Sequence, residues 1–151
     1  MKNLSFIFSL ALLFFVASCK KDDATTPAKP KKDILVSKTW LLAEVTALGS
    51  IVAFNKDKKP TSDNLFDLSK VRLIFKADGT MTGVDNSGKA ISGGKWVLSS
   101  DDTKLTISNT GITGVDGEQT VIQITETNLD VKGKVPYLGN VVDATIKAIP
   151  E

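Results

Sequence analysis

Apolar and polar residues alternate in short stretches over most of the chain. Val71, Leu73 and Phe75 fall on one face of a predicted strand, and Trp96 and Leu98 fall on one face of another. Glycine, asparagine and aspartate interrupt this pattern at intervals of about 8 to 12 residues, as they do between successive short strands. Beyond residue 33, no long stretch has apolar residues at the spacing of an amphipathic helix. The pattern therefore predicts an all-β domain.

The spacing predicts about eight strands joined in sequence order. Antiparallel hairpins with one buried and one solvated face account for the alternation, and eight such strands can close into a barrel that has no exposed edges. Residues 61–68 are the one place where a helix competes with a strand, and there Thr61, Ser62 or Asp63 can cap a short helical turn. We therefore expect a small antiparallel up-and-down barrel of about eight strands with one short helical turn. The strands are predicted at residues 40–48, 71–76, 80–84, 95–99, 105–107, 120–125, 129–131 and 142–148, with a loop over residues 133–140.

The first residues of the chain have the pattern of a secretory leader. Lys2 provides a positive charge, and residues 4–17 are apolar except for Ser5 and Ser9. This stretch is shorter than the roughly 20 residues that a transmembrane helix needs, and it matches the apolar region of a signal peptide. We predict that residues 1–18 are a signal peptide.

The leader ends in Val16-Ala17-Ser18-Cys19, which resembles the lipobox of bacterial lipoproteins. The resemblance implies that the leader is cut before Cys19, that the thiol of Cys19 carries a diacylglycerol, and that the new amino terminus is acylated. Each buried methylene contributes roughly 0.8 kcal/mol, so two or more acyl chains would hold the protein on a membrane stably. The alternative is a core helix that happens to end in cysteine.

Residues 19–33 are predicted to form a lipidated, flexible tether, because residues 20–33 contain no apolar side chain larger than alanine or proline. Within it, Lys21-Asp22-Asp23 resembles the export tag of Bacteroidota lipoproteins, which directs such proteins to the outer face of the outer membrane. The resemblance implies a lipid-anchored protein at the cell surface. A position on the periplasmic face of the outer membrane is the alternative.

Composition removes several functional classes. The chain has no histidine and one cysteine, which excludes Ser-His-Asp and Cys-His catalysis, His-ligated metals, an intrachain disulfide and thiolate zinc clusters. The net charge of +2 belongs to the leader and tether, since residues 34–151 carry 13 basic and 14 acidic side chains. A nucleic-acid partner is therefore not expected. We also predict no enzymatic activity, no cofactor and no metal site.

Several aspartates lie in predicted turns and raise the question of calcium or acid-pair chemistry. Asp85, Asp101-Asp102 and Asp116-Gly117-Glu118 lack the repeated oxygen-ligand spacing of a calcium loop. Aspartate next to glycine is also the ordinary composition of a turn. A hydrolase that uses two of these carboxylates remains a minor alternative.

Residues 34–151, the predicted barrel domain, resemble the lipocalin-like domains of Bacteroidota lipoproteins. The resemblance rests on the start Ser37-Lys38-Thr39-Trp40-Leu41-Leu42, on the hairpin at residues 73–80 (LIFKADGT), on the strand pair at residues 94–98 and 102–107, and on the strand turn at residues 124–129. It implies a small lipocalin-like barrel, and eight strands are just wide enough either to pack solid or to hold one small ligand.

The two tryptophans are the sharpest candidates for a binding site. Trp40 and Trp96 either line an apolar pocket at the barrel mouth, or plug one end of the barrel and fill its core; we favour the second arrangement. We expect the barrel to bind a small apolar or glycan-derived ligand. The alternative is an interaction module that binds a protein partner in an outer-membrane complex. The candidate ligand-binding residues, all predicted to face inward, are Trp40, Phe75, Trp96, Leu98 and Ile122, and Ile107, Ile124 and Val142 are expected to face inward as well.

Overall fold

The computed structural model describes residues 28–58, 67–112 and 114–151. The predicted signal peptide, Cys19 and the Lys21-Asp22-Asp23 tag lie outside the described residues. Residues 61–66 of the predicted helical turn lie outside them too, and Asp67 and Leu68 are not helical. No helix in the described ranges is long and apolar enough to cross a membrane.

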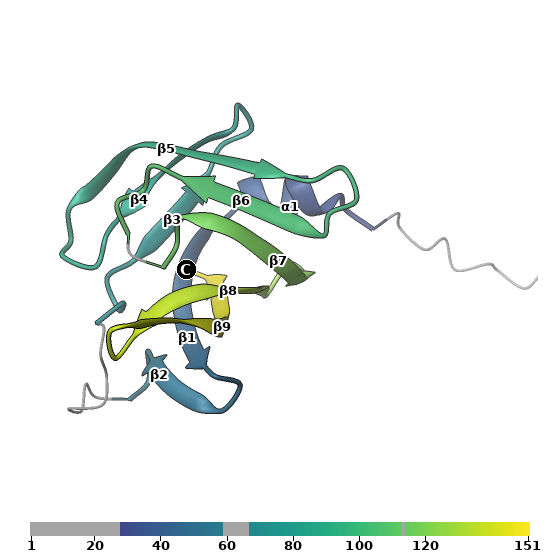
Figure 1. Ribbon diagram of the computed structural model, residues 1–151. Coiled ribbons are helices and arrows are strands. Elements are labelled where there is room, and N and C mark those ends of the chain that lie inside the picture. Colours follow the sequence, from purple (N-terminus) through teal and green to yellow (C-terminus); the bar gives the residue numbers. More distant parts are fainter. Residues whose placement is uncertain (1–27, 59–66, 113) are drawn as a thin grey trace, which may run out of the picture.

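The described residues form an antiparallel β-barrel with one short helix (Figure 1). β1 pairs with β3, and each strand from β3 to β8 pairs with the next. Because β9 also pairs with β1, eight strands close into a ring. β2 pairs with the second half of β1 and stands outside this ring. The prediction of an all-β antiparallel barrel of about eight strands is confirmed, and β2 is one additional strand beside it. The elements are α1 (Lys31–Val36), β1 (Thr39–Ala47), β2 (Ile51–Asn55), β3 (Arg72–Phe75), β4 (Thr80–Val84), β5 (Ala90–Leu98), β6 (Lys104–Ser108), β7 (Gly117–Ile124), β8 (Leu129–Tyr137) and β9 (Asn140–Pro150).

Alternate residues of the strands build the core. In β6, for example, Leu105 and Ile107 are buried and Thr106 between them is exposed. Burying each large aliphatic or aromatic side chain contributes about 1.5–3 kcal/mol, which is what holds the ring of strands closed. The prediction that Ile107 and Ile124 face inward is confirmed, and Val142 packs against the core while half-buried.

The helix α1 corrects the predicted end of the tether. Residues 31–33 were assigned to the tether, but they form the first half of α1, whose Ile34 and Leu35 are buried against the barrel. The helix starts directly after Pro30, whose φ of −53° suits a helix entry. A six-residue helix is too short to show an amphipathic period in the sequence, so the alternation rule could not detect it.

The predicted loop at residues 133–140 is wrong. β8 continues to Tyr137, β9 starts at Asn140, and Leu138 and Gly139 make the turn with φ angles of 49° and 79°. Two consecutive positive φ values are typical of the tight hairpin turn that matches strand twist. Pro136 lies in the part of β8 that β7 does not reach, where a missing N–H breaks no bond to a second neighbour.

The prediction that Ile122 faces inward is also wrong, because Ile122 is 48% exposed. The β7–β8 register shifts between Val121 and Gln123, which leaves Ile122 as an extra residue in a β-bulge. After the bulge, Ile124 returns to the interior. One inserted residue reverses the two-residue alternation, so the pattern of the sequence pointed Ile122 to the wrong face.

β7 and β8 separate from each other along part of their length. Their pairing ends at Thr120 and Lys132, so the first three residues of β7 and the last five of β8 are not joined by a ladder. Gln119, which is 2% exposed, fills the space behind this separation and donates a hydrogen bond from Nε2 to the Val115 carbonyl at 3.3 Å. The barrel wall is therefore closed here by a side chain and not by backbone hydrogen bonds.

Candidate functional site

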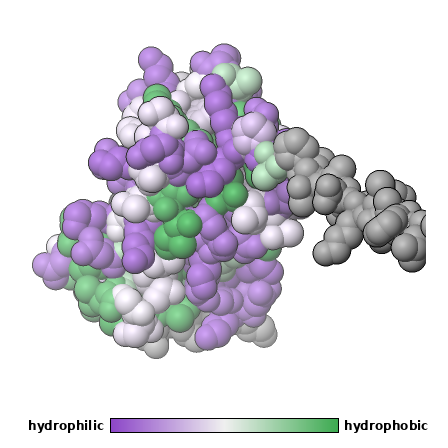
Figure 2. All heavy atoms as spheres, turned by 90° about the vertical axis from the view of Figure 1, so that its right-hand side faces the viewer, coloured by the Kyte–Doolittle hydropathy of each residue, from purple (hydrophilic) through white to green (hydrophobic). Residues whose placement is uncertain are grey.

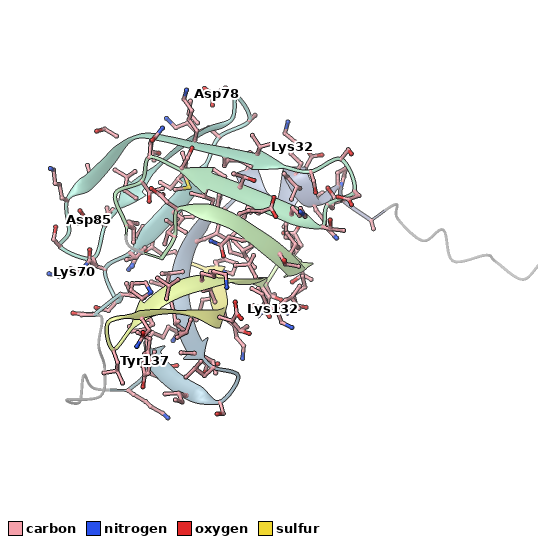
Figure 3. All side chains as sticks on the ribbon, viewed as in Figure 1. Lys32, Lys70, Asp78, Asp85, Lys132 and Tyr137 are labelled. Carbon is pink, nitrogen blue, oxygen red and sulfur yellow. The ribbon has the colours of Figure 1, made fainter. Side chains whose placement is uncertain are left out.

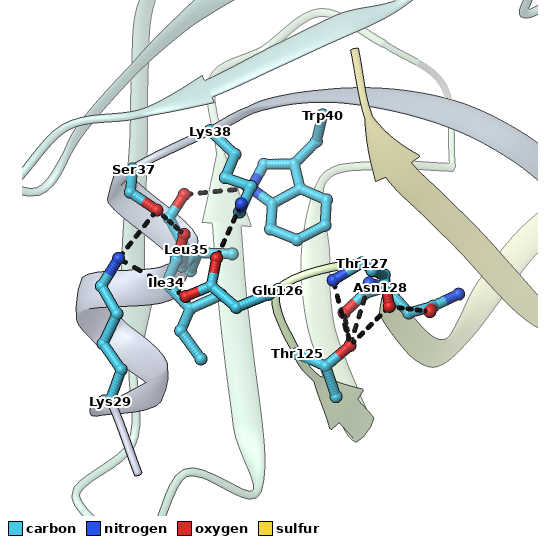
Figure 4. A network of polar contacts seen from close by, with 10 residues as sticks. All are labelled: Lys29, Ile34, Leu35, Ser37, Lys38, Trp40, Thr125, Glu126, Thr127 and Asn128. Atoms are coloured by element: carbon cyan, nitrogen blue, oxygen red, sulfur yellow. Dashed lines mark hydrogen bonds and ion pairs between the residues drawn. The ribbon is translucent and has the colours of Figure 1, made fainter. Parts of the chain in front are cut away.

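Trp40 is part of the seal between α1 and the end of the barrel. Its side chain is fully buried, and its indole Nε1 donates to the Leu35 carbonyl at 3.0 Å (Figure 4). Beside it, the Lys38 ammonium lies 2.7 Å from a carboxylate oxygen of Glu126, and this contact lowers the pKa of Glu126. Trp40 thus closes one end, as we favoured, and is not available to line a pocket mouth.

Phe75 and Trp96 meet inside the barrel. Their ring centroids are 5.4 Å apart at an interplanar angle of 82°, an edge-to-face pair, and the Trp96 Nε1 donates to the Lys76 carbonyl at 2.9 Å. Trp96 is only 4% exposed. Both rings are therefore core residues, with the polar atom of the indole satisfied by backbone.

Leu98 and Trp96 share a shallow cleft of about 250 Å³ at the outside of the barrel. Lys32 lies over the indole, with its Nζ 6.0 Å from the ring centroid, and Asp78 also lines the cleft. Asp78 is engaged in its own turn, where it accepts hydrogen bonds from the backbone and hydroxyl of Thr80. Of the five candidate ligand-binding residues, this cleft brings together two.

The barrel interior holds little free space. Two gaps among the described core residues have volumes of about 30 Å³ and about 20 Å³. A gap of this size has room for about one water molecule, and ligand pockets usually have 300 Å³ or more. The larger gap is lined by aliphatic and aromatic side chains apart from Gln119, and these include Leu42, Phe75, Leu105, Leu129 and Ile146.

A groove on the outer surface is much larger. It has a volume of about 500 Å³ and lies where β7 and β8 separate, on the side of the molecule where Figure 3 places Lys132. We call it the β7–β8 groove. The face of the molecule that Figure 2 shows is largely hydrophilic with small hydrophobic clusters. The groove is lined by Gly49 of the β1–β2 turn, Glu118 and Thr120 of β7, Lys132, Gly133 and Lys134 of β8, and Asp143, Ala144 and Thr145 of β9.

Two ion pairs border the β7–β8 groove. Lys104 Nζ lies 2.8 Å from Glu118 Oε1, and this contact raises the pKa of Lys104. Lys134 Nζ lies 2.8 Å from Asp143 Oδ1 and lowers the pKa of Asp143. The groove therefore presents charged and hydroxyl groups around a floor of small residues, and it contains no aromatic side chain.

The sequence did not reveal this groove. Its floor is made by Gly133 and Ala144, which pair across β8 and β9, and Gly133 was read as the beginning of a loop. The only available signal was the alternation of Lys132 and Lys134 around a glycine, which fits an outward face of a strand as well as a loop.

The turn aspartates act within their own turns. Asp85 Oδ1 accepts from the backbone amides of Ser87 and Lys89, and Asp116 accepts from the backbone amide of Thr110 at 3.1 Å. The Ser87 hydroxyl bond lowers the pKa of Asp85. Within the described ranges, acidic residues nowhere gather as a group of three or more that could hold a metal ion.

A scan against models of known protein families and a search of curated proteins found no match to this chain.

Proposed function

We propose that this protein is a lipid-anchored, non-enzymatic binding module of the bacterial outer membrane, exposed at the cell surface, which binds a glycan-derived ligand in the β7–β8 groove. The main observation behind this choice of binding site is the difference in volume between the barrel interior and the groove. The interior gap measures about 30 Å³ and the groove about 500 Å³.

The character of the groove supports one of the two ligand classes expected from the sequence. An apolar ligand needs an apolar cavity, and the interior is filled by residues such as Phe75 and Trp96. The groove offers Thr120 and Thr145 together with carboxylates and ammonium groups, which are hydrogen-bonding partners for hydroxyl-rich molecules. These partners support a saccharide and not a lipid.

The location is supported by the amino-terminal sequence. The apolar residues 4–17, the lipobox ending in Cys19 and the Lys21-Asp22-Asp23 tag together resemble the leader of a surface lipoprotein. The polar residues that follow are suited to hold the barrel away from the lipid surface. A non-enzymatic role is supported by the lack of histidine in the sequence and by the use of Asp85, Asp101 and Asp116 in turns.

The binding site can be tested with the full chain, purified in detergent and isotopically labelled for NMR. A panel of neutral and acidic trisaccharides is expected to shift the amide resonances of Thr120, Lys132 and Thr145. The fluorescence of Trp40 and Trp96 should stay constant, because both rings are buried in the core. A panel that moves no groove resonance, or a ligand that changes the tryptophan emission first, would contradict the proposal.

A matched pair of variants sharpens this test. Thr145→Trp places a large ring in the groove and should abolish the shifts. Val97→Trp places the same ring at an exposed position on β5, beside the shallow cleft at Trp96, and should leave them intact. If Val97→Trp loses binding and Thr145→Trp keeps it, the ligand binds in that cleft and not in the groove.

A second candidate function is protein interaction, and one observation favours it. Leu48, Ile51 and Val52 are 57%, 39% and 39% exposed on the β1–β2 hairpin, which Figure 1 shows at the bottom of the molecule. Exposed apolar patches often mark contacts between proteins. Crosslinking in intact cells, followed by purification from membranes, should recover a partner; recovery of this chain alone would count against this function.

A further inference from the structure

Among the described residues, no carboxylate pairs with the ammonium of Lys132 in the β7–β8 groove, and we propose that the groove selects anionic saccharides, with Lys132 binding a carboxylate or sulfate on a sugar ring. This inference rests on the proposed function, because it takes the groove as the saccharide site. It adds the chemical class of the ligand and the residue that recognises it.

Lys132 lies in a row of outward-facing residues that crosses five strands. Thr120 of β7 pairs with Lys132, and Lys132 pairs with Thr145 of β9. The row continues to Lys104 of β6 on one side and to Thr46 of β1 on the other. Side chains opposite each other on adjacent strands are about 5 Å apart. The side chain of Lys132 therefore leaves the sheet between two threonines.

The other charges in the groove are already paired. Glu118 is engaged by Lys104, and Asp143 is engaged by Lys134, each at 2.8 Å. Among the described residues, Lys132 makes neither an ion pair nor a side-chain hydrogen bond, and the same is true of the hydroxyls of Thr120 and Thr145. The row thus offers one positive charge and two hydroxyls to a ligand.

This arrangement favours an anionic sugar over a neutral one. An ammonium group is a compact charge with three N–H donors, and it binds carboxylate or sulfate oxygens through charge-assisted hydrogen bonds. The two threonine hydroxyls can donate to ring substituents or accept from them. A neutral sugar can use the hydroxyls, but it leaves the positive charge of Lys132 to water.

The test uses the full chain in detergent and three trisaccharides of the same length. These are trigalacturonate, galactotriose, and galactotriose that carries one sulfate. At low ionic strength we expect at least one anionic probe to bind about fivefold more tightly than galactotriose, the range of a solvent-exposed ion pair. The preference should shrink as salt is added, because exposed charges are screened. Which anionic probe binds distinguishes a carboxylate from a sulfate ligand.

Lys132→Gln removes the charge and should bring the affinity for the anionic probe down to that for galactotriose, whereas Lys132→Arg should keep the preference. Lys95→Gln is a matched control, because Lys95 also lies between hydroxyl residues, Thr80 and Ser108, on paired strands outside the groove. Lys95→Gln should leave the affinities for all three probes unchanged.

Three results would overturn the inference. If galactotriose binds as tightly as both anionic probes, or if Lys132→Gln leaves the preference intact, Lys132 is not the selecting residue, although the groove still binds saccharides. If none of the three probes shifts groove resonances, the inference fails together with the proposed function.

Discussion

At the scale of single residues, the contact between Gln119 and Gly133 shows how the barrel wall is closed. The Gln119 Oε1 atom is buried and has no hydrogen-bond partner within the part of the chain that the structure describes, and it occupies the space that a side chain at position 133 would need. A Cβ added to Gly133 would lie 1.5 Å from this oxygen. Glycine is required here by space, since the φ angle of Gly133 is not in the left-handed region.

We therefore expect Gly133→Ala to destabilise the fold by about 1–3 kcal/mol, as overpacking of a core does. The free energy of unfolding in urea measures this loss. Gln119→Ala should create the missing space, so that the double variant loses less than the sum of the two single variants. Strictly additive losses would show that the two residues do not compete for space.

Asp101 provides a prediction about pH. Hydrogen bonds donated by the Ser99 and Thr103 hydroxyls lower the pKa of its carboxyl from 3.8 to about 2. Because the folded pKa is below the unfolded one, this contribution to stability is fully present above pH 3.8 and is lost as the pH falls towards 2. An NMR titration should find the low pKa, and Ser99→Ala should raise it. A pKa near 3.8 in the unmodified chain would refute this reading.

At the scale of elements, α1 is stable only because it is docked. A helix of six residues does not persist alone in water. Its buried Ile34 and Leu35, the bond from Trp40 to the Leu35 carbonyl and the Lys38–Glu126 ion pair hold it on the barrel (Figure 4). The chain therefore enters the barrel through α1, at the end that Trp40 seals.

Leu35→Ala should cost about 2–5 kcal/mol, because it removes a fully buried side chain. Thermal unfolding followed by tryptophan fluorescence measures the loss. Asp33→Asn, on the exposed face of the same helix, should cost no more than about 1 kcal/mol. Equal losses in the two variants would mean that α1 is not anchored through Leu35.

The bulge in β7 makes a second prediction for an element. Ile122→Thr should change the free energy of unfolding by less than about 0.5 kcal/mol, because the side chain is on the surface. Ile124→Thr should cost at least about 1 kcal/mol, because it places a hydroxyl in the core. Chemical denaturation of both variants measures the two losses. A larger loss in Ile122→Thr than in Ile124→Thr would contradict the bulge in β7.

At the scale of the whole molecule, the proposed location depends on residues before the barrel. Cys19→Ala should move the protein from the membrane fraction to the soluble fraction, since it removes the predicted site of lipid attachment. Immunoblotting of separated fractions measures this, and unchanged fractionation would contradict a lipid anchor. Replacing Lys21, Asp22 and Asp23 by alanine should keep the protein in the membrane fraction while protecting it from protease added to intact cells.

Much of the barrel could be predicted from the sequence, because alternation reports local side-chain direction. It placed Ile107, Ile124 and the Phe75–Trp96 pair inside and set most of the strand order. It failed at Ile122, where one extra residue reversed the alternation, and at residues 133–140, where Gly133 and Pro136 looked like loop residues. The β7–β8 groove could not be predicted, because it depends on where two strands separate.

The sequence alone was sufficient for the all-β class and for the lack of histidine and disulfide chemistry, because composition and a two-residue period are properties of the chain itself. Only the tertiary structure decided that the interior is filled, that Trp40 seals one end with α1, and that Lys132 lies between Thr120 and Thr145 in an outer groove. The reason is physical. Free volume and cross-strand neighbours depend on register and on the closing of the barrel, which join residues far apart in the chain.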